Sequence, residues 1–98
     1  AGIALTKAMS KDYAGDNILV NTVCIGLIKS GQWQRRWQEQ GSEPTLDDYY
    51  AERGKAVPLG RVGESEEAGD IIAFLASDRA SYITGTAVNV DGGTAPVV

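Results

Sequence analysis

Few residues in this chain of 98 could do chemistry on their own. It has no histidine and one cysteine, Cys24, so it holds no imidazole base, no histidine metal ligand and no cysteine–histidine nucleophile pair. Cys24 lies in an apolar run and is interpreted as a small core residue. Three acids, Glu64, Glu66 and Glu67, gather where a helix is predicted to begin. Because a helix N-terminus favours negative charge, we interpret them as structural rather than catalytic.

The number and distribution of the charged residues argue against a nucleic acid as a partner. Net charge is −4, from 13 acidic and 9 basic residues, and the basic residues form no stripe, so nucleic acid is not expected. Four of them, Arg35, Arg36, Arg53 and Lys55, could meet an anionic substrate, although scattered surface charge is the simpler interpretation. No apolar run approaches the roughly 20 residues that span a bilayer. We expect a cytoplasmic protein with no membrane partner, and a single cysteine suits a reducing compartment.

The elements that would position these residues follow an α/β order. Residues 1–13 have a helical period through Ala1, Leu5, Ala8, Met9 and Tyr13, with Gly15 as the expected residue after the helix end. Residues 18–25 are apolar and β-branched, as in a strand buried in a parallel sheet, and residues 86–90 form a second strand candidate. The helix before that second strand carries one apolar face, made of Ala68, Ile71, Ile72, Leu75 and Ala76. The predicted unit is strand, crossover, parallel strand.

The middle of the chain is predicted to form two short helices. Trp33 and Trp37 are four residues apart on the first, and Tyr49 and Tyr50 lie on the second, which begins at Thr45. Such an insertion, over about residues 31–57, could be a lid over an active site. The alternative is that the tryptophans close the core or an oligomer contact. The sequence leaves both open.

Residues 58–93, which read PLGRVGESEEAGDIIAFLASDRASYITGTAVNVDGG, resemble the C-terminal portion of the classical short-chain dehydrogenases/reductases. Residues 1–31 are similar to the second half of that family's catalytic helix, its sixth strand and the start of its substrate loop. The resemblance implies the C-terminal part of a Rossmann-like, doubly wound parallel sheet: helix, strand, lid helices, helix, strand. Residues 1–98 would then be part of a single domain.

The resemblance also implies an activity, an NAD(P)-dependent oxidoreductase that transfers hydride between NAD or NADP and a small-molecule carbonyl or alcohol. The family's Tyr-x-x-x-Lys pair would end immediately before Ala1, and its Gly-rich turn and catalytic serine would lie further upstream. No catalytic residue is therefore expected in this chain, and alone it should be inactive. The family implies a homo-oligomer, tetramer or dimer, with contacts through the first helix, the last helix and the last strand.

Residues 25–30, IGLIKS, correspond to the family's cofactor turn Pro-Gly-x-Ile/Val-x-Thr. The resemblance assigns Gly26, Ile28 and Ser30 to the nicotinamide side of the cofactor. Ile25 replaces the usual proline, which frees φ and restores an N–H, and so loosens the turn. The stretch follows a predicted buried strand, whose carboxyl end is the usual ligand edge of an open α/β sheet.

Two other functions stay open on the sequence. A non-catalytic oligomerisation or binding module derived from the same fold would explain the missing catalytic residues and the Ile25 departure. An unrelated α/β domain, such as half of a receiver or methyltransferase, would need acidic or cofactor motifs at the strand ends, and none is found.

Overall fold

The computed structural model describes residues 2–95; Ala1, with which the first helix was predicted to begin, and residues 96–98 lie outside them. The main elements in chain order are α1 (Gly2–Tyr13), β1 (Thr22–Ile25), α2 (Gly31–Glu39), α3 (Leu46–Gly54), α4 (Ser65–Leu75) and β2 (Ala87–Val90). Short 3₁₀ turns at Ala14–Asp16 and Asp78–Ala80 follow α1 and α4.

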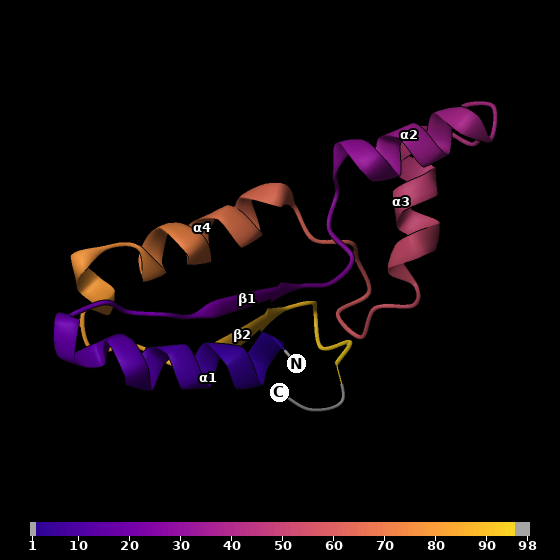
Figure 1. Ribbon diagram of the computed structural model, residues 1–98. Helices are drawn as coiled ribbons and strands as arrows, with labels where there is room; N and C mark the ends of the chain where they lie inside the picture. The colour runs from indigo at the N-terminus through magenta and orange to yellow at the C-terminus, as the bar shows by residue number, and fades with distance from the viewer. Residues whose placement is uncertain (1, 96–98) are drawn as a thin grey trace.

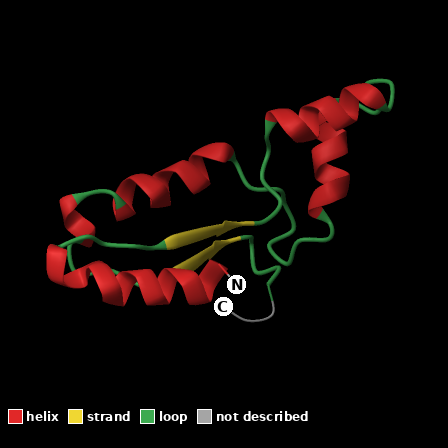
Figure 2. Cartoon of the chain, in the orientation of Figure 1, coloured by secondary structure: helices red, strands yellow, loops and turns green. Residues whose placement is uncertain are grey.

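The two strands form a parallel pair between two helices. Their register runs from Thr22 opposite Ala87 to Ile25 opposite Val90. In Figure 1, α4 covers one face of the pair and α1 the other, while α2 and α3 project beyond the carboxyl ends of the strands. This three-layer arrangement confirms the predicted α/β class and the parallel crossover (Figure 2).

β1 is shorter than the predicted strand over residues 18–25. Before Thr22, the Gly85 N–H donates to the Val20 carbonyl at 2.7 Å, and side chains make further hydrogen bonds in place of a ladder. The Val20 N–H donates to the Thr84 hydroxyl at 3.0 Å, and the Asn21 amide both donates to the Ile83 carbonyl and accepts from the Thr86 N–H, each at 3.1 Å. Because an asparagine side chain can stand in for a backbone partner, the chain stays extended here without strand pairing.

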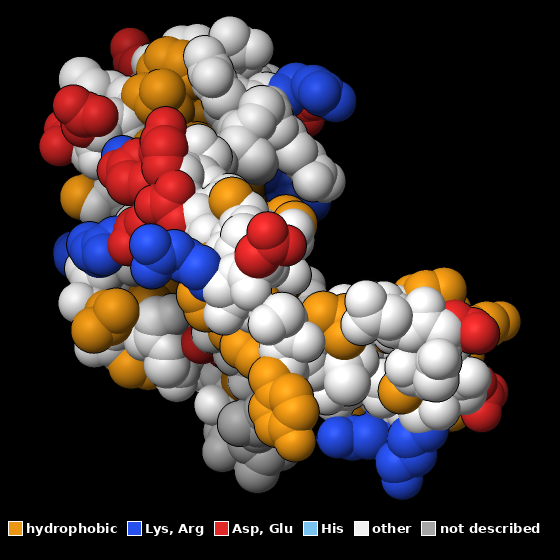
Figure 3. All heavy atoms as spheres, turned by 90° about the vertical axis from the view of Figure 1, so that its left-hand side faces the viewer, with side chains coloured by type: hydrophobic (Ala, Val, Ile, Leu, Met, Phe, Trp, Pro, Cys, Tyr) orange, Lys and Arg blue, Asp and Glu red, His pale blue; other side chains and the backbone are white. Residues whose placement is uncertain are grey.

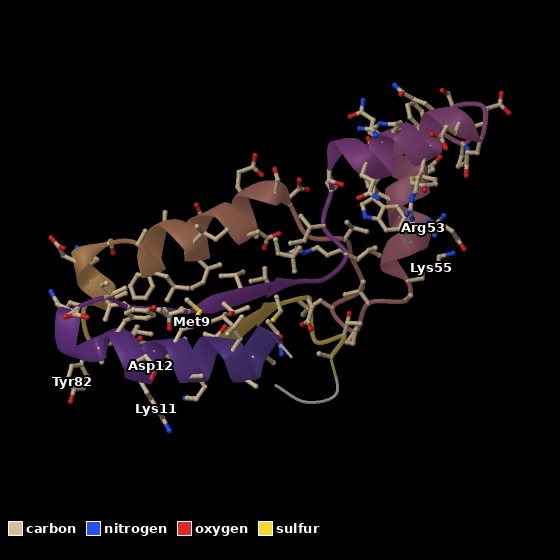
Figure 4. All side chains as sticks on the ribbon, in the orientation of Figure 1. Met9, Lys11, Asp12, Arg53, Lys55 and Tyr82 are labelled. Atoms are coloured by element: carbon tan, nitrogen blue, oxygen red, sulfur yellow. The ribbon has the colours of Figure 1, made fainter. Side chains whose placement is uncertain are left out.

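The helix α1 faces the sheet with a different side from the one its apolar period indicates. Thr6 and Ser10 are its buried residues, whereas Leu5 is 60% exposed. The Thr6 hydroxyl donates to the Gly2 carbonyl at 2.8 Å and also hydrogen bonds to the Thr22 hydroxyl on β1. Small side chains let the helix approach closely: a Cβ at Gly85 would lie 2.6 Å from the Ser10 Oγ. Lys11 and Asp12 point away from the sheet (Figure 4).

The end of α1 also differs from expectation. Gly15 was predicted to be the residue that follows the helix end, but it lies inside the 3₁₀ turn. The left-handed residue is Asn17, with φ 58° and ψ 36°, and its N–H donates to the Ala14 carbonyl. Asparagine tolerates this conformation better than other residues with a side chain, so the turn closes two residues later than predicted.

The predicted apolar face of α4 is only partly covered. Ala68 is buried and Ile71 and Leu75 are half-buried, whereas Ile72, at 50% exposure, and Ala76 are exposed. The side of α4 that meets β1 is therefore narrower than the period predicts. On the face drawn in Figure 3, acidic and basic side chains are interspersed with hydrophobic ones.

A hydrophobic core holds α2 and α3 together. Its buried residues are Tyr49 and Tyr50 of α3 and Val62 of the following loop, and the partly buried Leu27, Trp33, Trp37 and Leu46 pack against it. The two tryptophans therefore close a core, which was one of the two sequence interpretations. This core sits on two chain segments that join it to the rest of the molecule. They pair at a single parallel bridge between Ile28 and Gly63.

Candidate functional site

A cavity of about 490 Å³ opens beyond the carboxyl end of β1, between the α2 side of the molecule and α4. The three predicted site residues, Gly26, Ile28 and Ser30, all line it. The rest of its lining comes from the neighbouring chain, from α2 and from the first half of α4: Ile25, Lys29, Gln32, Trp33, Ser65, Ala68, Gly69 and Ile72. The structure thus brings the predicted residues to one wall of one cavity.

Gly26 turns the chain at the end of the strand. Its N–H donates to the Val90 carbonyl at 3.0 Å, which extends the ladder one bond past Ile25. A Cβ at this position would lie 2.5 Å from the Asp91 Cβ and 2.8 Å from its Cα. A residue with a side chain would therefore force the two strand ends apart. Glycine lets them stay together, although Ile25 stands where the resembled family has proline.

Ile28 has a buried side chain, and its backbone N–H and carbonyl point away from Gly63, its bridge partner. The bridge to Gly63 uses the Leu27 carbonyl, at 3.0 Å, and the Lys29 N–H, at 2.9 Å. Because successive peptide groups of an extended chain point to opposite sides, the N–H and carbonyl of Ile28 face the other way. Within residues 2–95 neither has a hydrogen-bond partner. One backbone donor and one acceptor are thus free at the wall of the cavity.

Ser30 caps α2. Its backbone is extended, with φ −155° and ψ 167°, and its hydroxyl oxygen accepts from the Trp33 N–H at 3.4 Å. An N-cap serine satisfies one of the free N–H groups of the first turn. The hydroxyl hydrogen is not used by that contact, so Ser30 can still donate into the cavity.

Lys29, which sequence reasoning did not single out, joins the two connecting segments. Its Nζ lies 2.7 Å from Glu64 Oε1 and 5.4 Å from the centre of the Tyr50 ring. The hydrogen bond to Glu64 raises the pKa of Lys29 above its ordinary 10.5. The pair was not visible in the sequence because 35 residues separate the partners.

Two of the three acids at the start of α4, Glu64 and Glu67, have the structural role that the sequence predicts. Glu67 accepts two hydrogen bonds from the Arg61 guanidinium, at 2.8 and 3.0 Å, and one from the Glu64 N–H at 2.9 Å. The Arg61 bonds, followed by the Glu64 N–H, lower the pKa of Glu67 to about 2. A carboxylate held ionised in this way cannot serve as a general acid near neutral pH.

Among residues 2–95, no cluster of three metal-ligating side chains occurs, and no helix is both long and apolar enough to cross a membrane. Cys24 lies half-buried in β1 as a free thiol.

Comparison with known proteins places this architecture in a family. A family model described as enoyl-(acyl carrier protein) reductase matches residues 1–95. A meso-2,3-butanediol dehydrogenase of Serratia marcescens is 40% identical over 95% of this chain and 34% of its own length. A 3-oxoacyl-acyl-carrier-protein reductase of Thermotoga maritima is 40% identical over 93% of this chain and 33% of its own.

A solved structure has the same fold as well as a similar sequence. An NADPH-bound short-chain oxidoreductase of Pseudomonas aeruginosa, described as containing an atypical catalytic centre, superposes with a TM-score of 0.81. It is 36% identical, over 98% of this chain and 36% of that one. The chain thus spans about a third of the length of the relatives it matches. The match over residues 1–95, with the parallel crossover and the helices on both faces, shows that the chain belongs to the short-chain dehydrogenase/reductase family.

Proposed function

We propose that the protein containing this chain is an NAD(P)-dependent oxidoreductase that transfers hydride between the cofactor and a small-molecule carbonyl or alcohol. The observation that carries the proposal is that the N–H and carbonyl of Ile28, a residue lining the 490 Å³ cavity, have no hydrogen-bond partner among residues 2–95. A nicotinamide carboxamide presents one acceptor oxygen and an amide donor, and the N–H and carbonyl of Ile28 complement both. Family membership supports the same cofactor.

Each of the three cavity residues has a proposed part in holding that group. Ile28 would bind the carboxamide through its backbone, and Ser30 would donate its hydroxyl hydrogen to the carboxamide or to a nearby phosphate oxygen. Gly26 keeps the strand ends close, so that the cavity wall stays in place. The bound cofactor would supply or accept the hydride. The residues of this chain would bind and orient the cofactor, and the acid–base residues of the reaction would come from elsewhere in the protein.

Residues 31–57 would act as the lid over the substrate. They stand beyond the sheet on two connecting segments, and Trp33 lines the cavity. The segments that carry the lid are joined to each other by the Ile28–Gly63 bridge and the Lys29–Glu64 ion pair, and closure would come from movement of these segments relative to the sheet. We propose further that residues 1–98 are the C-terminal part of one domain, that the protein is cytoplasmic, and that it forms a homotetramer or homodimer. Exposed apolar residues on α1 and α4, such as Leu5 and Phe74, support a contact through these helices.

The test is a titration of the whole protein with NADH and with NADPH, followed by fluorescence, on variants at two helix caps. Ser30→Gly removes the hydroxyl, and we expect about tenfold weaker binding, as for one hydrogen bond to a charged or polar ligand group. Ser30→Thr keeps the hydroxyl and should bind like the wild type.

Thr45→Gly is the matched control. Thr45 caps α3, and its hydroxyl accepts from the Asp48 N–H at 3.2 Å, but it does not line the cavity. Equal losses at Ser30 and Thr45 would mean that cap strength, and not a cofactor contact, explains the effect. Failure of the wild-type protein to bind either nucleotide would overturn the proposal and favour a binding or assembly role.

A further inference from the structure

Two arginines from different helices lie on the same tryptophan. The guanidinium carbon of Arg36, on α2, is 4.8 Å from the centre of the Trp33 ring, and that of Arg53, on α3, is 5.2 Å from it. Arg53 also lies 5.0 Å from the centre of the Tyr49 ring. Figure 4 shows Arg53 on α3, in the part of the molecule that stands away from the sheet. Basic residues that look scattered in the sequence are therefore brought together by the fold.

Neither guanidinium has a carboxylate partner in the part of the chain that the structure describes. By contrast, Lys29, Lys55 and Arg61 each form an ion pair, with N–O distances of 2.7 to 2.8 Å. Stacking on a ring occupies the face of a guanidinium and leaves its in-plane N–H groups free. Two like charges on one ring also repel each other, and a bound anion would relieve that repulsion.

A cavity adjoins Arg53. Arg53 and Tyr49 line a second cavity of about 420 Å³ with Gln40, Pro44, Glu52 and Ala56. The Tyr49 hydroxyl is buried and has no hydrogen-bond partner among the described residues. One acid, Glu52, belongs to this lining, but Lys55 pairs with it at 2.8 Å. Its charge is therefore neutralised by that lysine.

Trp33 connects this arginine pair to the proposed reaction site. Trp33 lines the 490 Å³ cavity together with Gly26 and Ser30, and the guanidinium groups of Arg36 and Arg53 lie over its ring. We propose that Arg36 and Arg53 bind an oxyanion group of the substrate, a carboxylate or a phosphate, that lies several bonds from the reacting carbon. The inference rests on the proposed function and adds the substrate class to it: an anionic hydroxy or oxo compound that passes along the Trp33 ring.

The experiment measures anion binding without relying on turnover. The whole protein is labelled with 5-fluorotryptophan, the Trp33 resonance is assigned with Trp33→Phe, and the sample is titrated at constant ionic strength with malonate or with its neutral isostere malonamide. We expect a saturable shift of the Trp33 resonance with malonate and none with malonamide. Arg36→Gln and Arg53→Gln should each weaken malonate binding about fivefold, as for one partly solvated charge-assisted hydrogen bond.

Arg35→Gln is the matched control, because Arg35 lies on the same helix, is exposed, and among residues 2–95 stacks on no ring. It removes the same charge and should leave malonate binding unchanged. The inference is overturned if malonate gives no saturable shift, if malonamide gives the same one, or if all three arginine variants weaken binding alike. NADH and NADPH titrations on the same samples test the proposed function separately. If the protein binds malonate but neither nucleotide, the proposed function fails while the anion site stands.

Discussion

At the scale of single residues, the clearest electrostatic feature is Glu67 in the first turn of α4. Its pKa falls from the ordinary 4.5 to about 2, first through the Arg61 hydrogen bonds and then through the Glu64 N–H. On acidification the unfolded chain takes up a proton at this site before the folded chain does. The contribution of Glu67 to stability is therefore complete above about pH 4.5 and is lost as the pH falls toward 2.

We predict that Glu67→Gln lowers the thermal unfolding midpoint near neutral pH and that this deficit disappears as the pH approaches 2. The glutamine keeps the length of the side chain and an acceptor for the Glu64 N–H, so the variant removes mainly the charge. Glu66→Gln, in the same turn and without a side-chain hydrogen bond in the described chain, should show no such pH dependence. A deficit of the same size at pH 7 and at pH 2.5 would contradict the assignment, since the charge is then not its cause.

At the scale of elements, the family resemblance picked out Gly26, Ile28 and Ser30, which line the cavity, whereas hydrophobic period and turn chemistry predicted the helices and the parallel crossover. They did not predict which face of α1 meets the sheet, because that depends on small residues far apart in the sequence, Ser10 and Gly85. They also overestimated β1, because the Asn21 side chain replaces ladder bonds. The Ile28–Gly63 bridge and the meeting of Arg36 and Arg53 are contacts between distant segments, and no local pattern encodes them.

The packing of α3 on the loop before α4 gives the prediction at this scale. Gly54, the last residue of α3, is buried, and a Cβ there would lie 2.7 Å from the Arg61 Cα. Because the obstacle is backbone, we expect Gly54→Ala to destabilise the protein by about 1–3 kcal/mol in chemical denaturation. Gly69→Ala, on α4 with nothing within 4 Å of its Cβ, should instead stabilise it by about 0.5–1 kcal/mol. Equal effects of the two alanines would show that α3 does not press on the Arg61 backbone.

At the scale of the whole molecule, the chain is less compact than a globular domain of its length. Its radius of gyration is 16.6 Å, whereas a compact domain of about 100 residues has one of about 13 Å. It measures 53 × 25 × 21 Å, because α2 and α3 stand beyond the sheet. Among residues 2–95 the sheet has two strands, so each strand has one edge without a partner in the described chain. Large apolar side chains are exposed on both helical layers and at the strand end, among them Leu5 at 60%, Ile25 at 56% and Ile72 at 50%.

These features predict how residues 1–98 would behave if they were produced alone. A two-stranded sheet with both edges free and few buried apolar side chains gives little cooperative packing. We expect the isolated polypeptide to bind a hydrophobic dye such as ANS and to unfold over a broad range of denaturant, while the whole protein unfolds sharply and binds little dye. The far-ultraviolet circular dichroism of the isolated piece should still show helix, because the periods of α1 and α4 are local. A single steep transition without dye binding would mean that the buried residues of this chain suffice to fold it. The exposed faces of α1 and α4 would then be free to serve as contacts between subunits.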